Sequence, residues 1–269
     1  MNALEKTMVE TLKELKADHF VIGVKAEFEA EGTRMEEALR LKDVVSAAGL
    51  DLTIKIGGCE ALKDMYDCRS IGVTRIVAPM IESSYALKKY LQATHMAYPE
   101  DEWKGIGFAI NVETNNTVER LDDILANPKV NELESFVIGR VDMSGSMGLT
   151  REDINSQKVF EITRDVCRRA KKHGIRCGIG GGVSASSMEF FRNLDGMLDF
   201  YETRKVIFDA HRALNAKPED GILKAVGFEL MWLKNKNKYY GMIHHEDDTR
   251  IQMLETRYSK MIEEAGGKH

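Results

Sequence analysis

Two carboxylates that each end an apolar run are the most informative residues of this 269-residue chain. Glu113 ends the run that begins at Gly107, and Asp142 ends the run that begins at Ser135. Because the carboxyl ends of parallel strands meet at one rim of a sheet, we expect the two carboxylates to lie side by side. They would repel each other, and a hard divalent cation such as Mg²⁺ would relieve that repulsion. The pair therefore predicts a metal site and an enzyme.

A structural explanation of the same carboxylates is also open. Glu113 could cap a helix that begins near Thr117, and Asp142 could open a turn made by Ser144 and Gly145. We favour the metal interpretation, because barrel enzymes place catalytic groups at the carboxyl ends of their strands.

The elements that would position these residues are strands that alternate with helices. Seven β-rich runs are evident, at residues 20–28, 52–57, 74–81, 107–114, 135–142, 176–183 and 198–208. Helical spacing of apolar residues separates them, which indicates a parallel sheet. The length of the chain fits an α/β fold of the (β/α)₈ TIM-barrel type, with an eighth strand that is weak or truncated at the N-terminal end. An open doubly wound sheet is the alternative.

Strand alternation places charged side chains inside this barrel. In the run 20–28, the residues expected to face the helices are apolar, namely Phe20, Ile22, Val24 and Ala26. Lys25 and Glu27 share the opposite, inner face, and Lys55 is inward on the next run. Charges inside a barrel are costly unless they pair, as Lys55 could with Glu27, or serve a site. Their repetition on several strands predicts a site.

Three segments in register resemble the HpcH/HpaI aldolase and citrate lyase beta-subunit superfamily, within a resemblance that covers residues 19–182. They are Ala-Pro-Met-Ile-Glu-Ser at 78–83, Asn-Val-Glu-Thr at 111–114 and Ile-Gly-Arg-Val-Asp-Met-Ser-Gly-Ser-Met-Gly at 138–148. The resemblance implies a metal-dependent barrel enzyme that makes or breaks a carbon-carbon bond next to a pyruvate-like enolate. It implies that Glu113 and Asp142 hold Mg²⁺ or Mn²⁺ and that the substrate is a small oxo-acid or acyl compound. We assign Glu82 and Ser144, which lie in these segments, to substrate binding.

Two positions depart from the pattern of that family. Phe28 follows Glu27 where a histidine or aspartate is usual, and Lys55 stands where an arginine is usual. We expect Lys55 to neutralise an enolate as a point charge, and Glu27 to move protons in place of the absent base. Lys25, Glu29, Glu82 and a metal-bound water are further candidates for the base. These departures leave the bond-forming or bond-breaking reaction open.

Two other groups of residues could bind an anionic part of the substrate. Glycines 180–182 would let backbone amides approach a phosphate, so Gly181 is a candidate for a phosphorylated substrate, although the glycines could simply allow a tight turn. Arg204 lies in the charged run 202–205 inside the last strand. It could bind a carboxylate or phosphate, or form an ion pair with Glu202. Lys25 is a further candidate substrate ligand.

The strand pattern ends near residue 215, which predicts a barrel domain at 1–215 and a helical extension at 216–269. Two helices are expected in the extension, at 222–236 and 250–265, on either side of residues 239–245. The first would expose Phe228, Met231, Trp232 and Leu233. This surface could pack on its own barrel or on a neighbouring subunit, and we predict a homo-oligomer. The run from His244 to Asp248 is interpreted as a solvated loop and not as a metal cluster.

Composition excludes several functional classes. The net charge of -5 and the scattered basic residues provide no face for nucleic acid. No apolar run approaches the ~20 residues needed to cross a membrane. The N-terminus lacks the apolar core of a signal peptide, which predicts a cytoplasmic protein.

Three functional hypotheses remain. The leading one is a metal-dependent (class II) aldolase or lyase. The second is a class I aldolase with a Schiff-base lysine, for which Lys25, Lys55 and Lys205 are candidates. The third is a barrel that has lost catalysis and serves as a binding or scaffold subunit.

Overall fold

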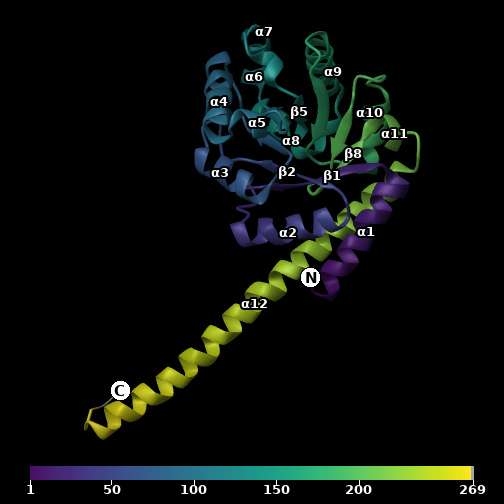
Figure 1. The fold of residues 1–269 in the computed structure, drawn as a ribbon. Helices are drawn as coiled ribbons and strands as arrows, with labels where there is room; N and C mark the ends of the chain where they lie inside the picture. The colour runs from purple at the N-terminus through teal and green to yellow at the C-terminus, as the bar shows by residue number, and fades with distance from the viewer. Residues whose placement is uncertain (268–269) are drawn as a thin grey trace. The chain divides into compact units, whose positions relative to one another are not determined.

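The core of the protein is a closed barrel whose eight strands follow one another in chain order. The structure is a computed structural model and describes residues 1–267. The strands are β1 (Val21–Glu27), β2 (Asp51–Lys55), β3 (Arg75–Ala78), β4 (Gly107–Val112), β5 (Ser135–Gly139), β6 (Arg176–Gly180), β7 (Phe200–Glu202) and β8 (Val206–Asp209). Figure 1 shows helices around this barrel, which confirms the predicted TIM-barrel class.

The helices alternate with the strands over most of the chain. The α-helices are α1 (Ala3–His19), α2 (Met35–Ala47), α3 (Leu62–Ile71), α4 (Ser84–Ala97), α5 (Glu100–Trp103), α6 (Asn115–Glu119), α7 (Leu121–Leu125), α8 (Arg140–Ser146), α9 (Gln157–Lys172), α10 (Met188–Arg192), α11 (Ala210–Ala213) and α12 (Pro218–Glu264). Short 3₁₀ helices are η1 (Val130–Glu132), η2 (Arg151–Asn155) and η3 (Ala185–Ser187).

The eighth strand comes from the run 198–208, which the sequence pattern predicted to be one strand. The structure divides this run into β7 and β8, which form an antiparallel pair with Tyr201 opposite Phe208. β8 is also antiparallel to β1, whereas the other neighbouring strands pair in parallel. The atypical strand is therefore the last one, and not one at the N-terminal end of the barrel.

The barrel interior changes from apolar to polar along the strands. One interior layer is a buried hydrophobic cluster made of Val77, Ala109, Val137, Phe200 and Ile207. Two residues further along their strands come Asn111, Gly139 and Glu202, which line a cavity. Strand alternation predicted that Ile22 faces the helices, but Ile22 packs against the hydrophobic cluster inside the barrel. The difference arises because the pairing of β1 with β8 shifts register between Val21 and Gly23.

The chain forms two compact units, residues 1–229 and the residues from 230 onward. Within the first unit, the beginning of α12 is tied to α1 by an ion pair of 2.7 Å between Lys224 and Glu14. Ile222, Ala225 and Phe228 are buried. The second unit contains the rest of α12.

The prediction of two C-terminal helices was wrong, because α12 is one continuous helix of 47 residues. The segment 239–245 contains no proline, and its single glycine costs a helix only about 1 kcal/mol. The run from His244 to Asp248 is consequently helical and not a loop. Phe228 and Trp232 were expected to be exposed and are buried, whereas Leu233 is exposed. Within the described residues, no helix is both long and apolar enough to cross a membrane.

Candidate active site

A cavity of about 450 Å³ opens where the strands of the barrel end. Its charged lining residues are Lys25, Glu27, Lys55, Glu113, Asp142, Arg151, Glu202, Arg204 and Glu229. Seven of the nine residues proposed from the sequence for the site line this cavity: Lys25, Glu27, Lys55, Glu113, Asp142, Gly181 and Arg204. The position agrees with the usual place of the active site in a barrel of this kind.

Glu113 follows the last residue of β4, and its side chain is buried. The backbone amide of Met80 donates to its Oε1 at 3.0 Å, and Nδ2 of Asn111 donates to its Oε2 at 2.7 Å. Met80 adopts a positive φ of 48°, a conformation that is unfavourable for a residue other than glycine. These contacts fix the direction of the carboxylate. The sequence did not indicate the role of the Met80 amide.

Asp142 reaches the cavity from a helix and not from a strand. β5 ends at Gly139, and residues 140–146 form α8, with Asp142 in its first turn. The alternative explanations from the sequence do not hold. The residue that caps α6 is Thr114, whose hydroxyl accepts from the amide of Thr117, and Asp142 lies within a helix and does not open a turn.

The two carboxylates supply oxygen donors of the kind that a hard divalent cation binds, and both line the same cavity. Burial raises the pKa of Glu113 above its ordinary value, and the charge of Asp142 raises it further. Lys55 and the hydrogen bonds from Asn111 and Met80 offset the shift only in part. A cation near both carboxylates would relieve this unfavourable burial. The described residues contain no group of three or more His, Cys, Asp or Glu side chains suited to hold a metal. Mg²⁺ usually binds one or two protein carboxylates and keeps several waters, so two carboxylate donors are compatible with such an ion.

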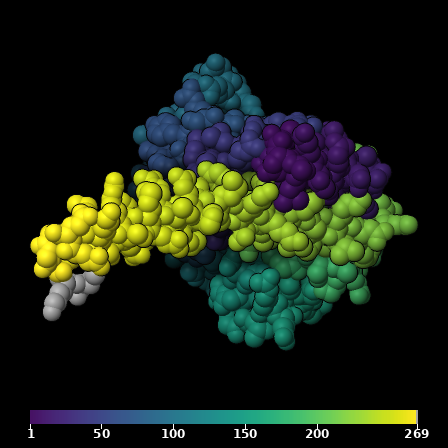
Figure 2. All heavy atoms as spheres, turned by 90° about the horizontal axis from the view of Figure 1, so that it is seen from below, coloured from purple at the N-terminus to yellow at the C-terminus, as the bar shows by residue number. Residues whose placement is uncertain are grey.

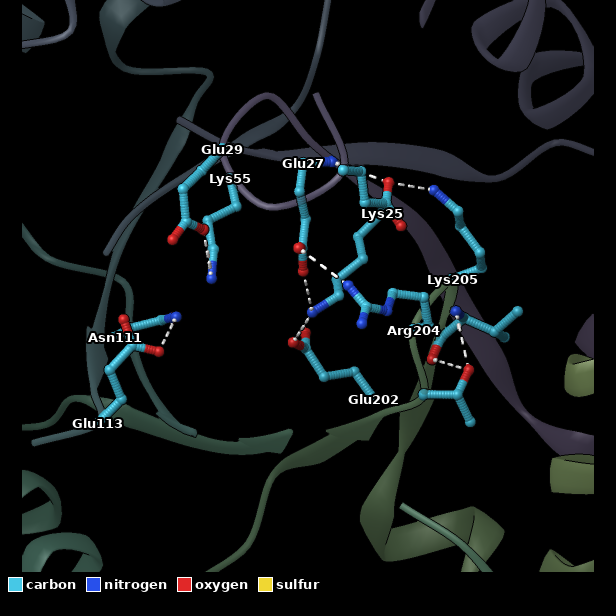
Figure 3. A network of polar contacts seen from close by, with 12 residues as sticks. Lys25, Glu27, Glu29, Lys55, Asn111, Glu113, Glu202, Arg204 and Lys205 are labelled. Atoms are coloured by element: carbon cyan, nitrogen blue, oxygen red, sulfur yellow. Dashed lines mark hydrogen bonds and ion pairs between the residues drawn. The ribbon is translucent and has the colours of Figure 1, made fainter. Parts of the chain in front are cut away.

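A network of alternating charges surrounds the other side of the cavity (Figure 3). Lys25 pairs with Glu27 at 3.2 Å and also with Glu202. Arg204 lies 3.4 Å from the Glu27 carboxylate, so its partner is Glu27 and not Glu202. The side chain of Arg204 remains 48% exposed. It therefore keeps donors available at the rim of the cavity.

Lys55 pairs with Glu29 at 2.7 Å, and not with Glu27 as the sequence suggested. Burial disfavours its charge, but the nearby Glu113 and the hydrogen bond to Glu29 outweigh burial and raise the pKa of Lys55. For Lys25, burial is likewise outweighed by Glu202 and Glu27, and its pKa is raised. Lys205 forms an ion pair with Glu31. A Schiff-base nucleophile needs a neutral amine, so this arrangement works against the class I hypothesis.

Arg140 anchors the glycine-rich loop after β6. Its guanidinium donates to the carbonyl oxygen of Gly181 at 3.0 Å and to Oγ of Ser187 at 3.1 Å. Burial lowers the pKa of Arg140 to about 10. Gly181 has a φ of +76°, and a Cβ on it would lie 2.7 Å from the amide nitrogen of Val141. The glycine is therefore required for the close approach of this loop to α8.

Two residues that were proposed from the sequence lie outside the cavity lining. Ser144 is fully buried, and its hydroxyl has no hydrogen-bond partner among the described residues. Asp142 and Ser144 are two residues apart on a helix, so their side chains point to different faces. Glu82 accepts a hydrogen bond of 2.6 Å from the hydroxyl of Thr114. Ser144 was assigned to the site because it lies in a segment that resembles the family, and the helix α8 carries it away from the face of Asp142.

Other lining residues could not be assigned from the sequence. Arg151 comes from η2, and Glu229 comes from α12. Neither carried a motif or a periodicity that pointed to the site. Asn111 and Glu202 had a weak signal, because each lies on the inner face of a strand.

Comparison with known proteins identifies a family. Residues 2–180 match the family model described as HpcH/HpaI aldolase/citrate lyase. Among curated proteins, none matches the sequence.

Solved structures with the same fold are distant in sequence. An HpcH/HpaI aldolase from Desulfitobacterium hafniense DCB-2 is 18% identical with a TM-score of 0.61, and the match covers 75% of this chain and 83% of the other. An HpcH/HpaI aldolase/citrate lyase family protein from Burkholderia cenocepacia J2315 is 14% identical with a TM-score of 0.60, over 86% and 90% of the two chains. A citrate synthase variant is 15% identical with a TM-score of 0.56, also over 86% and 90%.

Proposed function

Because this chain belongs to the HpcH/HpaI aldolase/citrate lyase family, we propose that it is a metal-dependent carbon-carbon lyase or aldolase acting on a small oxo-acid. The observation that carries the proposal is the placement of Glu113 and Asp142 on the wall of one cavity, together with Lys55 and Lys25. A bound Mg²⁺ or Mn²⁺ would supply Lewis-acid stabilisation of an enolate. Glu113 and Asp142 would hold it.

The residues of the chain would divide the remaining work. Asn111 and the Met80 amide orient Glu113 through hydrogen bonds. Lys55, held by Glu29, places a positive charge beside Glu113, where an enolate oxygen would develop negative charge. Glu27 lies on the cavity wall and is the carboxylate that we assign to proton transfer. The charges of Lys25 and Lys55 hold its pKa below its ordinary value, so it is ionised but is a weaker base than a free glutamate.

The rim of the cavity would recognise an anionic part of the substrate. Arg204 is half-exposed at the cavity wall, and Gly181 brings the glycine-rich loop to the same cavity. A guanidinium suits a carboxylate or a phosphate. We propose that the substrate carries such a group away from the reacting bond.

Calorimetric titration with Mn²⁺, in the presence of pyruvate or oxalate, tests the proposed function. The wild type should bind the metal, and Glu113→Gln and Asp142→Asn should each weaken binding by about 10- to 100-fold, since each removes one negatively charged ligand. Glu100→Gln, at an exposed carboxylate, is the matched control and should bind as the wild type does.

Four outcomes would contradict the proposal, the first three of which concern binding and trapping. The wild type could bind no metal, both site variants could bind as well as the wild type, or borohydride could trap the substrate on a lysine. The last result would favour the class I mechanism. Binding of metal and oxalate without turnover of any oxo-acid would favour the non-catalytic barrel.

A further inference from the structure

Arg151 differs from the other cations that line the cavity, because the protein does not neutralise it. The other three each form an ion pair with a carboxylate, namely Lys25, Lys55 and Arg204. Within residues 1–267, the guanidinium of Arg151 forms neither a hydrogen bond nor an ion pair. Arg151 is exposed, and Figure 2 shows part of the chain between β5 and β6 at the surface in teal to green. Its charge is therefore available to a ligand in the cavity.

The short helix η2 directs Arg151 toward the glycine-rich loop that follows β6. A Cβ on Gly182 would lie 2.5 Å from Cδ1 of Ile154, so Ile154 is the residue of η2 that packs on this loop. A 3₁₀ helix has three residues per turn, and residues three apart therefore lie on the same face. Arg151 shares the face of Ile154, and both Arg151 and Gly182 line the cavity.

Hydrogen bonds fix the start of η2. The amide of Thr150 donates to Oδ2 of Asp153 at 2.8 Å, and the amide of Glu152 donates to Oγ1 of Thr150 at 3.3 Å. These contacts hold the backbone that carries Arg151 and use the amides at this end of the helix. The donor that η2 presents to the cavity is consequently the side chain of Arg151.

The glycine-rich loop supplies further donors beside η2. Gly181 and Gly182 have φ values of +76° and +66°, which only glycine adopts without strain. The amides of Gly182 and Val183 donate to no acceptor within the described residues, and both residues line the cavity. A guanidinium and unpaired backbone amides of a glycine-rich loop are ligands that phosphate groups use in proteins.

We propose that Arg151 and the amides of Gly182 and Val183 bind a phosphate group of the substrate, on the part that does not become the enolate. A phosphate ester has three peripheral oxygens, which accept from donors in several directions, whereas a carboxylate has two oxygens in one plane. This inference rests on the function proposed above, because it takes the cavity to be the substrate site. It specifies the anionic group and the segment that selects it.

Calorimetric titration of the full chain with glycerol 3-phosphate tests the role of Arg151. EDTA is present, so that the phosphate cannot bind through a metal ion. The wild type should bind, and Arg151→Met should weaken binding by about 10-fold or more, because a charge-assisted hydrogen bond is lost. Arg151→Lys should fall between them, since an ammonium keeps the charge without the planar fork of donors. Arg168→Met removes the same charge from a largely exposed arginine of α9 and should bind as the wild type does.

A second pair of variants tests the loop. Gly182→Ala places a Cβ against Ile154 at a positive φ, so it should displace the loop and weaken binding of glycerol 3-phosphate. Gly72→Ala is the control, because Gly72 has a similar φ of +73° and a Cβ there meets nothing within 4 Å. It carries the same backbone strain outside the cavity lining and should leave the affinity unchanged. Far-ultraviolet circular dichroism checks that each variant is folded.

Three results would overturn the inference. The wild type could fail to bind glycerol 3-phosphate, Arg151→Met could bind it as the wild type does, or glycerate could bind as tightly as glycerol 3-phosphate. The last result would assign the site to carboxylates. The titration contains neither a metal nor an oxo-acid, so its outcome does not depend on Glu113 or Asp142. Failure of the proposed function would instead appear as absence of Mn²⁺ binding in the presence of oxalate.

Discussion

At the scale of single residues, Gly139 decides where the Glu113 carboxylate can lie. A Cβ on Gly139 would come within 2.8 Å of Oε2 of Glu113 and 2.9 Å of its Cβ. Real Cβ atoms do not approach other atoms so closely, so any larger residue would push Glu113 away. The sequence around Gly139 gave no sign of this requirement, because the two residues come from different strands.

We therefore predict that Gly139→Ala displaces Glu113 and weakens Mn²⁺ binding by about 10- to 100-fold, as loss of an orienting contact does at other metal sites. Isothermal titration calorimetry measures the change. Gly145→Ala is the control, since a Cβ there meets nothing within 4 Å, and it should bind metal as the wild type does. Equal affinities for the two variants would show that Glu113 does not need this space.

At the scale of elements, Arg140 joins three segments around the glycine-rich loop. It contacts carbonyl oxygens of Gly180 and Gly181, the side chain of Asn155 at the end of η2, and Ser187 in η3. Its guanidinium also lies 5.0 Å from the ring centroid of Phe191. A buried cation is costly by itself, so these contacts must compensate for its desolvation.

Arg140→Met should lower the free energy of unfolding by about 2–4 kcal/mol, because it leaves several buried acceptors without a donor. Chemical denaturation measures this loss. Arg168→Met, which changes a largely exposed arginine of α9, should alter stability by less than about 0.5 kcal/mol. Similar stabilities for the two variants would mean that solvent replaces the Arg140 contacts.

The hairpin of β7 and β8 shows why element boundaries could not be predicted. Its turn is closed by the amide of Thr203 donating to the carbonyl oxygen of Val206 at 2.9 Å. The turn contains no glycine, asparagine or proline, the residues that usually signal a hairpin. The run 198–208 was therefore predicted to be one continuous strand, because nothing in its sequence marked the turn between β7 and β8.

At the scale of the whole barrel, Lys25 connects the first and seventh strands through Glu202. It also neutralises Glu27, and together these groups form a triad at the cavity wall whose two carboxylates are buried. Burial opposes ionisation of Glu27, but the charges of Lys25 and Lys55 outweigh it and hold the pKa of Glu27 below its ordinary value. Because folding lowers this pKa, the ionised Glu27 stabilises the folded protein at pH values above the pKa that it has in the unfolded chain. This stabilisation is lost as the pH falls through the pKa that Glu27 has in the folded protein.

Lys25→Met should therefore cost about 3–5 kcal/mol of unfolding free energy at neutral pH, since it removes a cation from two buried carboxylates and leaves Glu27 with the half-exposed Arg204 as its ion-pair partner. The deficit should shrink as the pH falls through the acidic range, where Glu27 becomes protonated. Denaturation at several pH values measures this convergence. Lys63→Met, at an 81% exposed side chain, should show neither effect. A deficit independent of pH would indicate a packing defect and not an electrostatic one.

The sequence by itself determined the alternation of strands and helices, the inward direction of Lys25, Glu27 and Lys55, and the two carboxylates that meet at one cavity. These features follow from the period of the strand and from the direction of parallel strands, both of which are local properties of the backbone. They were sufficient for the barrel and for five of the nine charged residues that line the cavity.

Only the tertiary structure decided which charges pair and which residues enter the cavity. Lys55 meets Glu29, Arg204 meets Glu27, and Ser144 turns away from the cavity. Such pairings depend on how the closed barrel brings together strands that are far apart in the chain. They also depend on local geometry, such as the helix that begins at Arg140, which no alternation of residues revealed.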